Sequence, residues 1–505
     1  MPTLPVFTVD QIADYLTDGY WNEVGYTGLS YNLGSNRTLT VDLGDLTAQG
    51  QATARMALDA WSGVSGINFV ETSSGATITF DDDQAGAFAY MQGYGTTATS
   101  GHVNVHTSWL ASSGSPFATY GLQTYIHELG HALGLGHAGN YNVTGNYAED
   151  GTGDNHYLND SWQMSIMSYF SQSENTSTNA SIAYVVTPQL ADIQAIENLY
   201  GAGSVYGGDT LWGVGASGGH LDEVAGENVA FTLRDDGGTD TFAASDETRD
   251  QVIDLRAGAF SSVWGRTENM AITEGSVIEN AISGSGDDQM QGNAARNHLI
   301  AGAGDDVVYG GQMRDILEGG AGDDALYGEH GLDTLLGGDG NDILRGGVGR
   351  DVLKGQDGND NMHGGSGHDL LLGGAGDDFM FGNYGNDILN GFGDDDQLRG
   401  GQGADRLSGG LGNDRLVGGQ GNDELNGGEG ADTFVFTSQS GHDRIEDFET
   451  GDRISLAAVA SIAGYADLMA NHVQQTDDGV EITWGGSVLL LDQQLANFSE
   501  DMFLF

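Results

Sequence analysis

The sequence is poor in basic residues, proline and cysteine. Its 505 residues include 16 Lys and Arg against 73 Asp and Glu, a formal net charge of −57, with 4 Pro and no Cys. A surface of this sign repels nucleic acid and anionic membranes, so neither is expected as a partner. Without cysteine the chain has no disulfide and no thiol-based latency switch, although this does not by itself place it in the cytosol.

Two kinds of apolar segment are also missing. No apolar run reaches the length of a transmembrane helix, so membrane insertion is not expected. Residues 1–16 contain neither the basic region nor the apolar core of a secretory signal peptide. If the protein is exported, we expect the signal to lie elsewhere in the chain.

Glycine, in contrast, is abundant, and much of it follows one register. Between residues 283 and 435 the chain repeats every nine residues without insertion or deletion, which gives seventeen units. Gly fills most first, second and fourth positions, and an apolar residue such as Leu317 or Leu353 stands at the eighth. This is the nonapeptide pattern of calcium-binding β-rolls, in which two units form one turn. A flexible low-complexity linker is the alternative, but the register never slips.

The sixth position of the unit carries the expected calcium ligands. Gly permits turns with positive φ that leave backbone carbonyls free, and Asp adds a hard anionic oxygen. Sixteen of the seventeen units have Asp there, and Asn297 is the exception. Because each unit is too short to bury a core alone, we expect the array to fold when calcium binds these carboxylates. The predicted ligands are Asp288, Asp306, Asp315, Asp324, Asp333, Asp342, Asp351, Asp360, Asp369, Asp378, Asp387, Asp396, Asp405, Asp414, Asp423 and Asp432.

A second pattern is the eleven-residue stretch HELGHALGLGH, which begins at His127. His131 follows four residues later, so both imidazoles lie on one face of the helix predicted over 120–135. Gly134 can end this helix in a left-handed conformation, which turns the chain and returns His137 as a third ligand. Three imidazoles of this kind bind zinc and leave one position open to water.

Glu128 stands beside the first histidine and is predicted to accept a proton from the zinc-bound water. Thirty residues after the third histidine comes the segment SIMSY, in which Met167 is expected to form an apolar floor beneath the metal. Three structural histidines on a core helix, and a methionine used only for packing, are the alternatives. The complete spacing of both motifs favours the zinc site.

Outside these patterns the chain predicts a mixture of helices and strands. Helices are expected over 47–62 and 187–200, the second with Thr187 as N-cap and Pro188 at the first helical position. Strands are expected over 67–70, 76–80, 102–105, 480–484 and 488–491.

With these residues in view, the sequence resembles the serralysins, secreted metzincin proteases of Gram-negative bacteria. The resemblance includes the zinc motif, the turn Met167-Ser168-Tyr169, the helix that begins with Thr187-Pro188, and the VIENAI segment that leads into the repeats. It implies an α+β zincin/metzincin protease domain followed by an all-β parallel β-roll, or RTX, domain. It also implies one catalytic zinc, several structural calcium ions and the hydrolysis of peptide bonds in protein substrates.

The resemblance assigns further site residues. Tyr169 would be an additional zinc ligand that swings away when substrate binds and then hydrogen-bonds the tetrahedral intermediate; a buried tyrosine with a satisfied hydroxyl is the alternative. A further calcium site is implied between the protease and repeat domains, although DGG loops are also ordinary turns. Its expected ligands are Gly208, Thr210, Asp235, Gly237, Gly238 and Asp240.

The same resemblance implies a division of the chain and a route of export. The last five residues, DMFLF, look like the family's uncleaved C-terminal signal for the type I secretion machinery, so a secreted, monomeric protein is expected. The expected segments are 1–20 as a candidate propeptide or lead segment, 21–202 as the catalytic domain, 203–282 as a β linker with the calcium loop, 283–435 as the repeats, and 436–505 as a C-terminal β cap.

Two features depart from the family pattern. Ala138 follows the third histidine where the family usually has Pro, and the repeat array is longer than is usual. The alanine affects the subfamily assignment more than the chemistry. The longer repeat array raises the chance of an added role in binding surfaces.

The substrate is expected to lie extended along an edge strand, for which 102–105 is the candidate. The main rival function is a calcium-dependent surface or matrix protein whose first domain has lost activity, although no zinc ligand and no base is missing. A pore-forming toxin would need long apolar helices, which the chain lacks.

Overall fold

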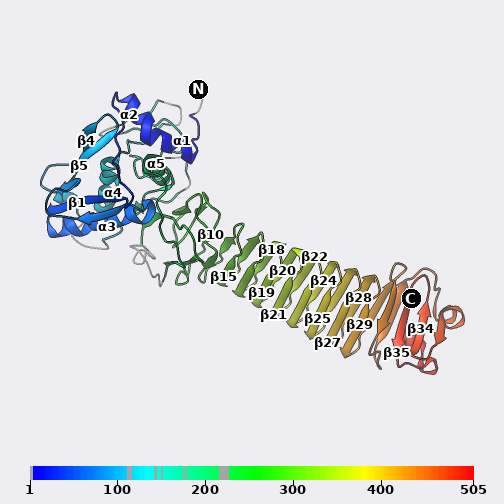
Figure 1. The fold of residues 1–505 in the computed structure, drawn as a ribbon. Coiled ribbons are helices and arrows are strands. Elements are labelled where there is room, and N and C mark those ends of the chain that lie inside the picture. The colour runs from blue at the N-terminus through cyan, green and yellow to red at the C-terminus, as the bar shows by residue number, and fades with distance from the viewer. Residues whose placement is uncertain are drawn as a thin grey trace. The chain divides into compact units, whose positions relative to one another are not determined.

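The structure is a computed structural model, and its described residues form two compact units (Figure 1). The first unit comprises Met1–Glu247 and Gln251–Asn280, and the second comprises Thr248–Asp250 and Ala281–Phe505. The first three residues of the expected lead segment lie outside the described residues. The structure describes residues 4–110, 116–141, 145–148, 152–172, 174–175, 177–178, 180–214 and 227–505.

The helices of the first unit include all three of those that the sequence predicts. The helix over 187–200 starts later than predicted, because Thr187 is not its N-cap. The Thr187 hydroxyl accepts a hydrogen bond from the backbone N–H of Thr232 (2.7 Å), so Gln189 becomes the N-cap and Asp192 closes a capping box with it. The helices are α1 (Val9–Asp14), η1 (Tyr15–Gly19), α2 (Tyr20–Glu23), α3 (Ala48–Ser65), η2 (Thr107–Trp109), α4 (Tyr120–Ala132) and α5 (Leu190–Tyr200).

A five-stranded sheet lies beside these helices, with strand order β2-β1-β3-β5-β4. Its four parallel strands end in β5, and β4 pairs with β5 antiparallel at the edge. The prediction that residues 102–105 form the edge strand is therefore wrong, because β5 is flanked by β3 and β4. The strands are β1 (Thr38–Asp45), β2 (Asn68–Glu71), β3 (Ile78–Asp81), β4 (Ala87–Tyr94) and β5 (Thr97–Val105).

Short strands make up the rest of the first unit. β11, β12, β8 and β6 form a small sheet, and β7 pairs with β9 in parallel. These strands are β6 (Tyr184–Val185), β7 (Leu211–Gly213), β8 (Val229–Leu233), β9 (Thr241–Ala243), β10 (Val252–Asp254), β11 (Phe260–Ser261) and β12 (Met270–Ile272), and β13 (Asn280–Ile282) follows them along the chain.

The second unit is a parallel β-roll, which confirms the predicted fold class. Even-numbered strands pair with one another in one sheet and odd-numbered strands in the other, so each strand aligns with the strand eighteen residues on (Figure 1). Leu335, Leu353 and Leu371 thus form one continuous buried ladder. The strands are β14 (Gln289–Gln291), β15 (His298–Ala303), β16 (Val307–Gly311), β17 (Ile316–Ala321), β18 (Ala325–Gly331), β19 (Thr334–Asp339), β20 (Ile343–Gly349), β21 (Val352–Asp357), β22 (Asn361–Ser366), β23 (Leu370–Ala375), β24 (Phe379–Tyr384), β25 (Ile388–Gly393), β26 (Gln397–Gln402), β27 (Arg406–Leu411), β28 (Arg415–Gln420), β29 (Glu424–Glu429) and β30 (Thr433–Thr437).

The roll continues for one turn beyond residue 435. β31 and β32 extend the two sheets, but Leu425 now aligns with Ile445 and Phe434 with Ile454, a shift of twenty residues instead of eighteen. The C-terminal strand β36 pairs with β32 and buries Phe503. The last elements are β31 (His442–Ile445), β32 (Arg453–Ala458), α6 (Tyr465–Asp467), η4 (Leu468–His472), β33 (Val473–Gln475), β34 (Gly479–Thr483), β35 (Ser487–Leu491), η5 (Leu495–Asn497), η6 (Glu500–Met502) and β36 (Phe503–Leu504).

Candidate metal centre and active site

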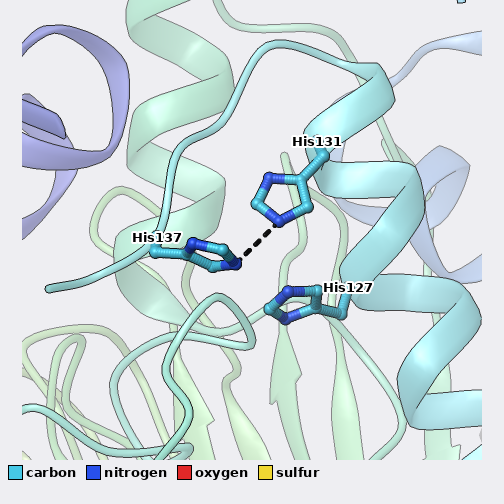
Figure 2. A group of neighbouring side chains, drawn as sticks. All are labelled: His127, His131 and His137. Atoms are coloured by element: carbon cyan, nitrogen blue, oxygen red, sulfur yellow. Dashed lines mark hydrogen bonds between the residues drawn. The ribbon is translucent and has the colours of Figure 1, made fainter. Parts of the chain in front are cut away.

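Two of the three predicted zinc ligands stand one turn apart on α4. His127 and His131 direct their rings toward the same point (Figure 2). Nδ1 of His127 donates to the carbonyl oxygen of Ile166 (2.8 Å), and Nδ1 of His131 donates to that of Leu135 (2.8 Å). Because a carbonyl oxygen only accepts, each ring carries its proton on Nδ1 and leaves Nε2 available to a metal.

Two glycines bring the third histidine to the other two. Gly134 has φ of 106°, and a Cβ there would lie 2.4 Å from the carbonyl oxygen of Leu29. A Cβ at Gly136 would lie 2.3 Å from the ring of Tyr20. His137 therefore reaches α4, where its Nε2 lies 3.0 Å from Nε2 of His131 (Figure 2). The ligand atoms of all three histidines lie within 4.8 Å of one another. Tetrahedral zinc holds nitrogens at about 2.0–2.1 Å and therefore about 3.3 Å apart, so this donor set fits it.

Burial sets the protonation of the site. It lowers the pKa of His127 to about 4 and that of His131 to about 3, and it lowers the pKa of His137 as well. All three imidazoles are neutral at pH 7, as metal ligands must be. Burial also raises the pKa of Glu128 to about 8, which a nearby cation would oppose. A carboxylate whose pKa is tuned toward neutrality suits a general base.

Glu128 lines a cavity of about 510 Å³ together with His131, His137 and Tyr169. The edge strand β4 contributes residues 87–91 to its wall. An edge strand presents unpaired backbone N–H and C=O groups, with which an extended peptide can pair. The N-terminal segment contributes the remaining apolar wall through Tyr20, Trp21, Val24, Tyr26, Thr27 and Leu29.

The predicted Met-turn lies directly against α4. Met167 is fully buried, and a Cβ on Gly130 of the helix would lie 2.6 Å from its sulfur. Asp192 at the start of α5 holds the turn, because its carboxylate accepts from Ser165 Oγ (2.6 Å) and from the backbone N–H of Ile166 (2.7 Å). The sequence analysis missed Asp192, although an acidic residue in the first turn of a predicted helix is a capping signal.

Tyr169 follows this turn and reaches the histidines. Its ring centroid lies 4.6 Å from that of His137 and 5.8 Å from that of His127. Burial raises the pKa of the Tyr169 phenol, so its hydroxyl stays protonated at neutral pH and can donate a hydrogen bond into the cavity.

The residues of the predicted loop site for calcium also come together in the first unit. The backbone N–H of Thr210 donates to Asp240 Oδ1 (2.8 Å), and that of Gly237 donates to Asp235 Oδ1 (3.0 Å). The carbonyl oxygen of Gly208 accepts from the hydroxyl of Thr210 (2.9 Å). Both carboxylates are buried, and among the described residues no donor contacts their Oδ2 atoms. Two such oxygens beside backbone carbonyls fit a calcium ion.

The repeat aspartates form a ladder along each row of turns. From Asp306 onward, Oδ1 of each accepts from the backbone N–H of the residue eighteen positions earlier, as in Asp351 from Asp333 and Asp369 from Asp351 (both 2.9 Å). Burial raises the pKa of Asp333 and of Asp369 to about 7. The buried Oδ2 atoms lack a donor within the described part of the chain at Asp306, Asp315, Asp324, Asp333, Asp342, Asp351, Asp360, Asp369, Asp378, Asp387, Asp396, Asp405, Asp414, Asp423, Asp432 and Asp443.

The first two positions of the ladder differ from this pattern. Oδ2 of Asp288 accepts from the hydroxyl of Ser283 (2.5 Å), and the side chain of Asn297 accepts from the backbone N–H of Asn293 (2.8 Å). Hydrogen bonds within the protein therefore satisfy the oxygens that would otherwise face an ion.

The far end of the ladder extends beyond the predicted repeats. Asp443 accepts from the backbone N–H of Asp423 (3.0 Å), and no donor among the described residues reaches its buried Oδ2. Asp452 occupies the equivalent place in the other row, but its two oxygens accept from Asp432 (3.0 Å) and Glu449 (2.7 Å). The sequence analysis missed Asp443 because a two-residue insertion breaks the period before it.

Models of three families match the chain. The Matrixin model covers residues 35–150, the peptidase M10 serralysin C-terminal model covers 204–363, and the RTX calcium-binding nonapeptide repeat matches 372–407, 399–434 and 408–445. A metallopeptidase AprA of Pseudomonas marginalis is 36% identical over 324 residues, which are 58% of this chain and 67% of that protein. The chain belongs to the serralysin family of metalloproteases.

Two further relatives bear the family name. A serralysin of Photorhabdus luminescens is 38% identical over 260 residues, 49% of this chain and 53% of its own length. A serralysin C of Dickeya chrysanthemi is 36% identical over 308 residues, 56% of this chain and 63% of its own length. The chain thus spans between about half and two thirds of the length of these relatives. Its family membership accounts for the protease-type first unit and for the calcium-binding repeats of the second.

Two further details of the structure concern the residue after the third histidine and the helices. The backbone N–H of Ala138 donates to the carbonyl oxygen of Met167 (3.2 Å), which ties the residue after the third histidine to the Met-turn. The proline that the family usually has at that position could not make this bond. Within the described residues, no helix combines the length and apolar character required to cross a membrane.

Proposed function

We propose that this serralysin is a zinc-dependent endopeptidase that hydrolyses peptide bonds in proteins outside the cell. The observation that carries the proposal is the convergence of three neutral imidazoles, a buried carboxylate and a tyrosine on one cavity beside an edge strand. His127, His131 and His137 would hold the ion through their Nε2 atoms. A bound zinc ion supplies Lewis-acid polarisation of a carbonyl group and makes water more acidic.

The protein groups around that site have separate tasks in the proposed reaction. Glu128 accepts a proton from the attacking water and returns it to the leaving amine. The hydroxyl of Tyr169 donates a hydrogen bond to the oxyanion that develops on the scissile carbonyl. Substrate backbone pairs with β4, which replaces β5 as the expected substrate strand and directs the scissile bond past Glu128.

Calcium has a structural task in the same proposal. Sites along the two rows of turns, from Asp306 to Asp443, would bind the ions, together with the loop site at Asp235 and Asp240. In the ion-free chain each unpaired carboxylate is buried at a cost in free energy, and a bound cation offsets that cost. Asp288 contributes least, because the hydroxyl of Ser283 already satisfies it.

Export and assembly complete the proposal. The C-terminal residues DMFLF would direct the chain to the type I secretion machinery, and calcium outside the cell would then fold the roll. Protein substrates are the proposed partners, and we propose a monomer. The five segments expected from the sequence, with a removable lead segment at 1–20, also stay a proposal.

Casein hydrolysis tests the catalytic part of the proposal. Purified wild type should cleave casein in millimolar calcium, and 1,10-phenanthroline should stop the reaction until zinc is restored. Glu128→Gln should lower kcat at least about 100-fold while it keeps the zinc. Glu71→Gln, on β2 at the opposite edge of the sheet from β4, is the matched control and should match wild type. Wild type that is folded, zinc-loaded and inert would favour the calcium-dependent binding protein instead.

A further inference from the structure

A buried carboxylate behind the Met-turn has no task in the reaction proposed above. Asp160 is fully buried, yet its carboxylate accepts only from hydroxyl groups among the contacts that the described residues make with it. Ser168 Oγ donates to Oδ1 (2.7 Å), and the hydroxyl of Tyr141 lies 3.1 Å from Oδ1 and 3.3 Å from Oδ2. Burial of a carboxylate is costly, so its presence here calls for a local reason.

Both hydroxyl groups lead to Tyr169. Ser168 is its neighbour in the chain, and the Ser168 hydroxyl also accepts from the backbone N–H of Phe170 (3.1 Å). The hydroxyl oxygen of Tyr141 accepts from the backbone N–H of Tyr169 (3.4 Å). The two tyrosine rings lie 4.7 Å apart with an interplanar angle of 32°. Asp160 therefore anchors the backbone on both sides of Tyr169 and the ring against which it packs.

Asp160 also sets the direction of these hydrogen bonds. A carboxylate only accepts, so the hydroxyl protons of Ser168 and Tyr141 must both turn toward it. Their oxygens are then free to accept from the backbone N–H groups of Phe170 and Tyr169. An asparagine at position 160 would keep one acceptor oxygen at the place of Oδ1. Its NH₂ group would replace Oδ2, 3.3 Å from the Tyr141 hydroxyl, and would compete with the backbone N–H of Tyr169 as a donor to that hydroxyl oxygen.

The segment that carries Asp160 is itself fastened to the same turn. The indole N–H of Trp162 donates to the carbonyl oxygen of Ser168 (2.9 Å), and its backbone N–H donates to that of Phe170 (2.9 Å). The side chain of Asn175 donates to the carbonyl oxygen of Asp160 (2.9 Å). These bonds fix the segment of Asp160 relative to the turn, so the carboxylate can hold the turn in one position.

We propose that Asp160 is a positioning residue, which holds Tyr169 through Tyr141 and Ser168 in the orientation needed at the scissile carbonyl. The proposal rests on the function proposed above, in which the Tyr169 hydroxyl acts on the oxyanion. In the described structure, the side-chain hydrogen bonds of Asp160 reach none of the three histidines, and Tyr141 is the only cavity-lining group among their donors.

A double-mutant cycle on full-length, zinc- and calcium-loaded protein tests the proposal. Asp160→Asn should lower kcat by about 10- to 100-fold with KM changed less than about 3-fold, since a misplaced transition-state donor costs that much. In a Tyr169→Phe background, Asp160→Asn should cost less than about 3-fold, because the group that it positions is already gone. Equal losses in both backgrounds would overturn the proposal. If wild type hydrolyses no peptide, the proposed function fails first.

Two further measurements keep the outcome decisive. Zinc content after dialysis should be the same in Asp160→Asn as in wild type, and loss of zinc would show that Asp160 acts on the metal site instead. Should Asp160→Asn fail to fold, Tyr141→Phe and Ser168→Ala each remove one donor and should show the same dependence on Tyr169. Asp82→Asn is the matched control, since that buried carboxylate accepts from Thr47 elsewhere in the unit. It should lower stability without a loss of kcat that depends on Tyr169.

Discussion

Replacement of Asp443 by Asn separates calcium binding from hydrogen bonding in the last turn of the roll. Oδ1 of Asp443 accepts from the backbone of Asp423, while the buried Oδ2 has no donor in the described structure. Asparagine keeps an oxygen for the first contact and removes the charge from the second. Asp452→Asn is the matched control, because both of its oxygens already accept backbone hydrogen bonds.

The magnitude follows from the linkage between binding and folding. With Kd of about 10⁻⁴–10⁻³ M, one site stabilises the fold by about 1.4–2.7 kcal/mol in about 10 mM calcium, and by about 0.1–0.4 kcal/mol in about 0.1 mM calcium. Asp443→Asn should lose the larger amount in high calcium. Without calcium it should be neutral or stabilising, because it removes a buried charge that has no partner. Asp452→Asn should cost about 1 kcal/mol in both, because it breaks a hydrogen bond.

Urea unfolding of the full-length protein, followed by circular dichroism at both calcium concentrations, measures these differences. The informative quantity is the change in the free energy of unfolding of each variant between high and low calcium. If Asp443→Asn and Asp452→Asn show the same change, an unpaired buried oxygen does not mark a calcium ligand in this roll. The assignment of the other fifteen ladder positions would then lose its basis as well.

Three further predictions concern the roll and the zinc site. Burial raises the pKa of Asp333 to about 7 and of Asp396 to about 8, above their values in the unfolded chain. The stability that these groups contribute is therefore fully present below about pH 4 and is lost as pH rises through about 7–8. Calcium-free protein should therefore show more β structure by circular dichroism at about pH 5 than at about pH 8, and a signal independent of pH would contradict this. Gly134→Ala should lower zinc content and reduce activity at least about 100-fold, because the new Cβ would collide with the carbonyl oxygen of Leu29 at a residue with positive φ. Gly75→Ala also has positive φ but open space around it, so it should change neither quantity. Equal behaviour of the two variants would refute this explanation. Leu353→Ala should lower the free energy of unfolding in calcium by about 2–5 kcal/mol, because Leu353 is buried in the ladder. Leu332 is exposed, so Leu332→Ala should change that free energy by less than about 0.5 kcal/mol. Similar losses in the two variants would argue against the buried ladder.

Several elements of the fold and site follow from local patterns that the sequence shows directly. The three histidines are predictable because helical spacing and a glycine turn determine their approach within eleven residues. The β-roll is predictable because each nine-residue unit repeats the same turn and the same inward apolar residue. The α3 helix and the strands β2 and β3 lie within three residues of their predicted ranges. In each case the deciding contacts are near in sequence or repeat at a constant interval.

Other features depend on residues that are distant in the chain. The order of the five strands makes β4, and not β5, the edge of the sheet, and no local pattern contains that order. The hydroxyl of Thr187 does not cap the helix, because it accepts a hydrogen bond from Thr232, forty-five residues away. Asp160 and Asp192 meet the Met-turn only in the folded unit, and no local pattern in the sequence indicates that contact.

The sequence by itself therefore determined the ligand set, the period of the roll and the family resemblance, because short-range spacing and repetition encode them. The folded arrangement shows which strand lines the cavity, which buried carboxylates bond to the Met-turn, and where, among the described residues, the aspartate oxygens without a donor begin and end. These depend on packing between distant segments, which a side chain's neighbours in sequence do not specify. Asp288 and Asp443 illustrate this difference. Asp288 lies within the regular repeat, but its oxygen accepts from Ser283, whereas Asp443 lies outside the repeat, and its Oδ2 has no donor among the described residues.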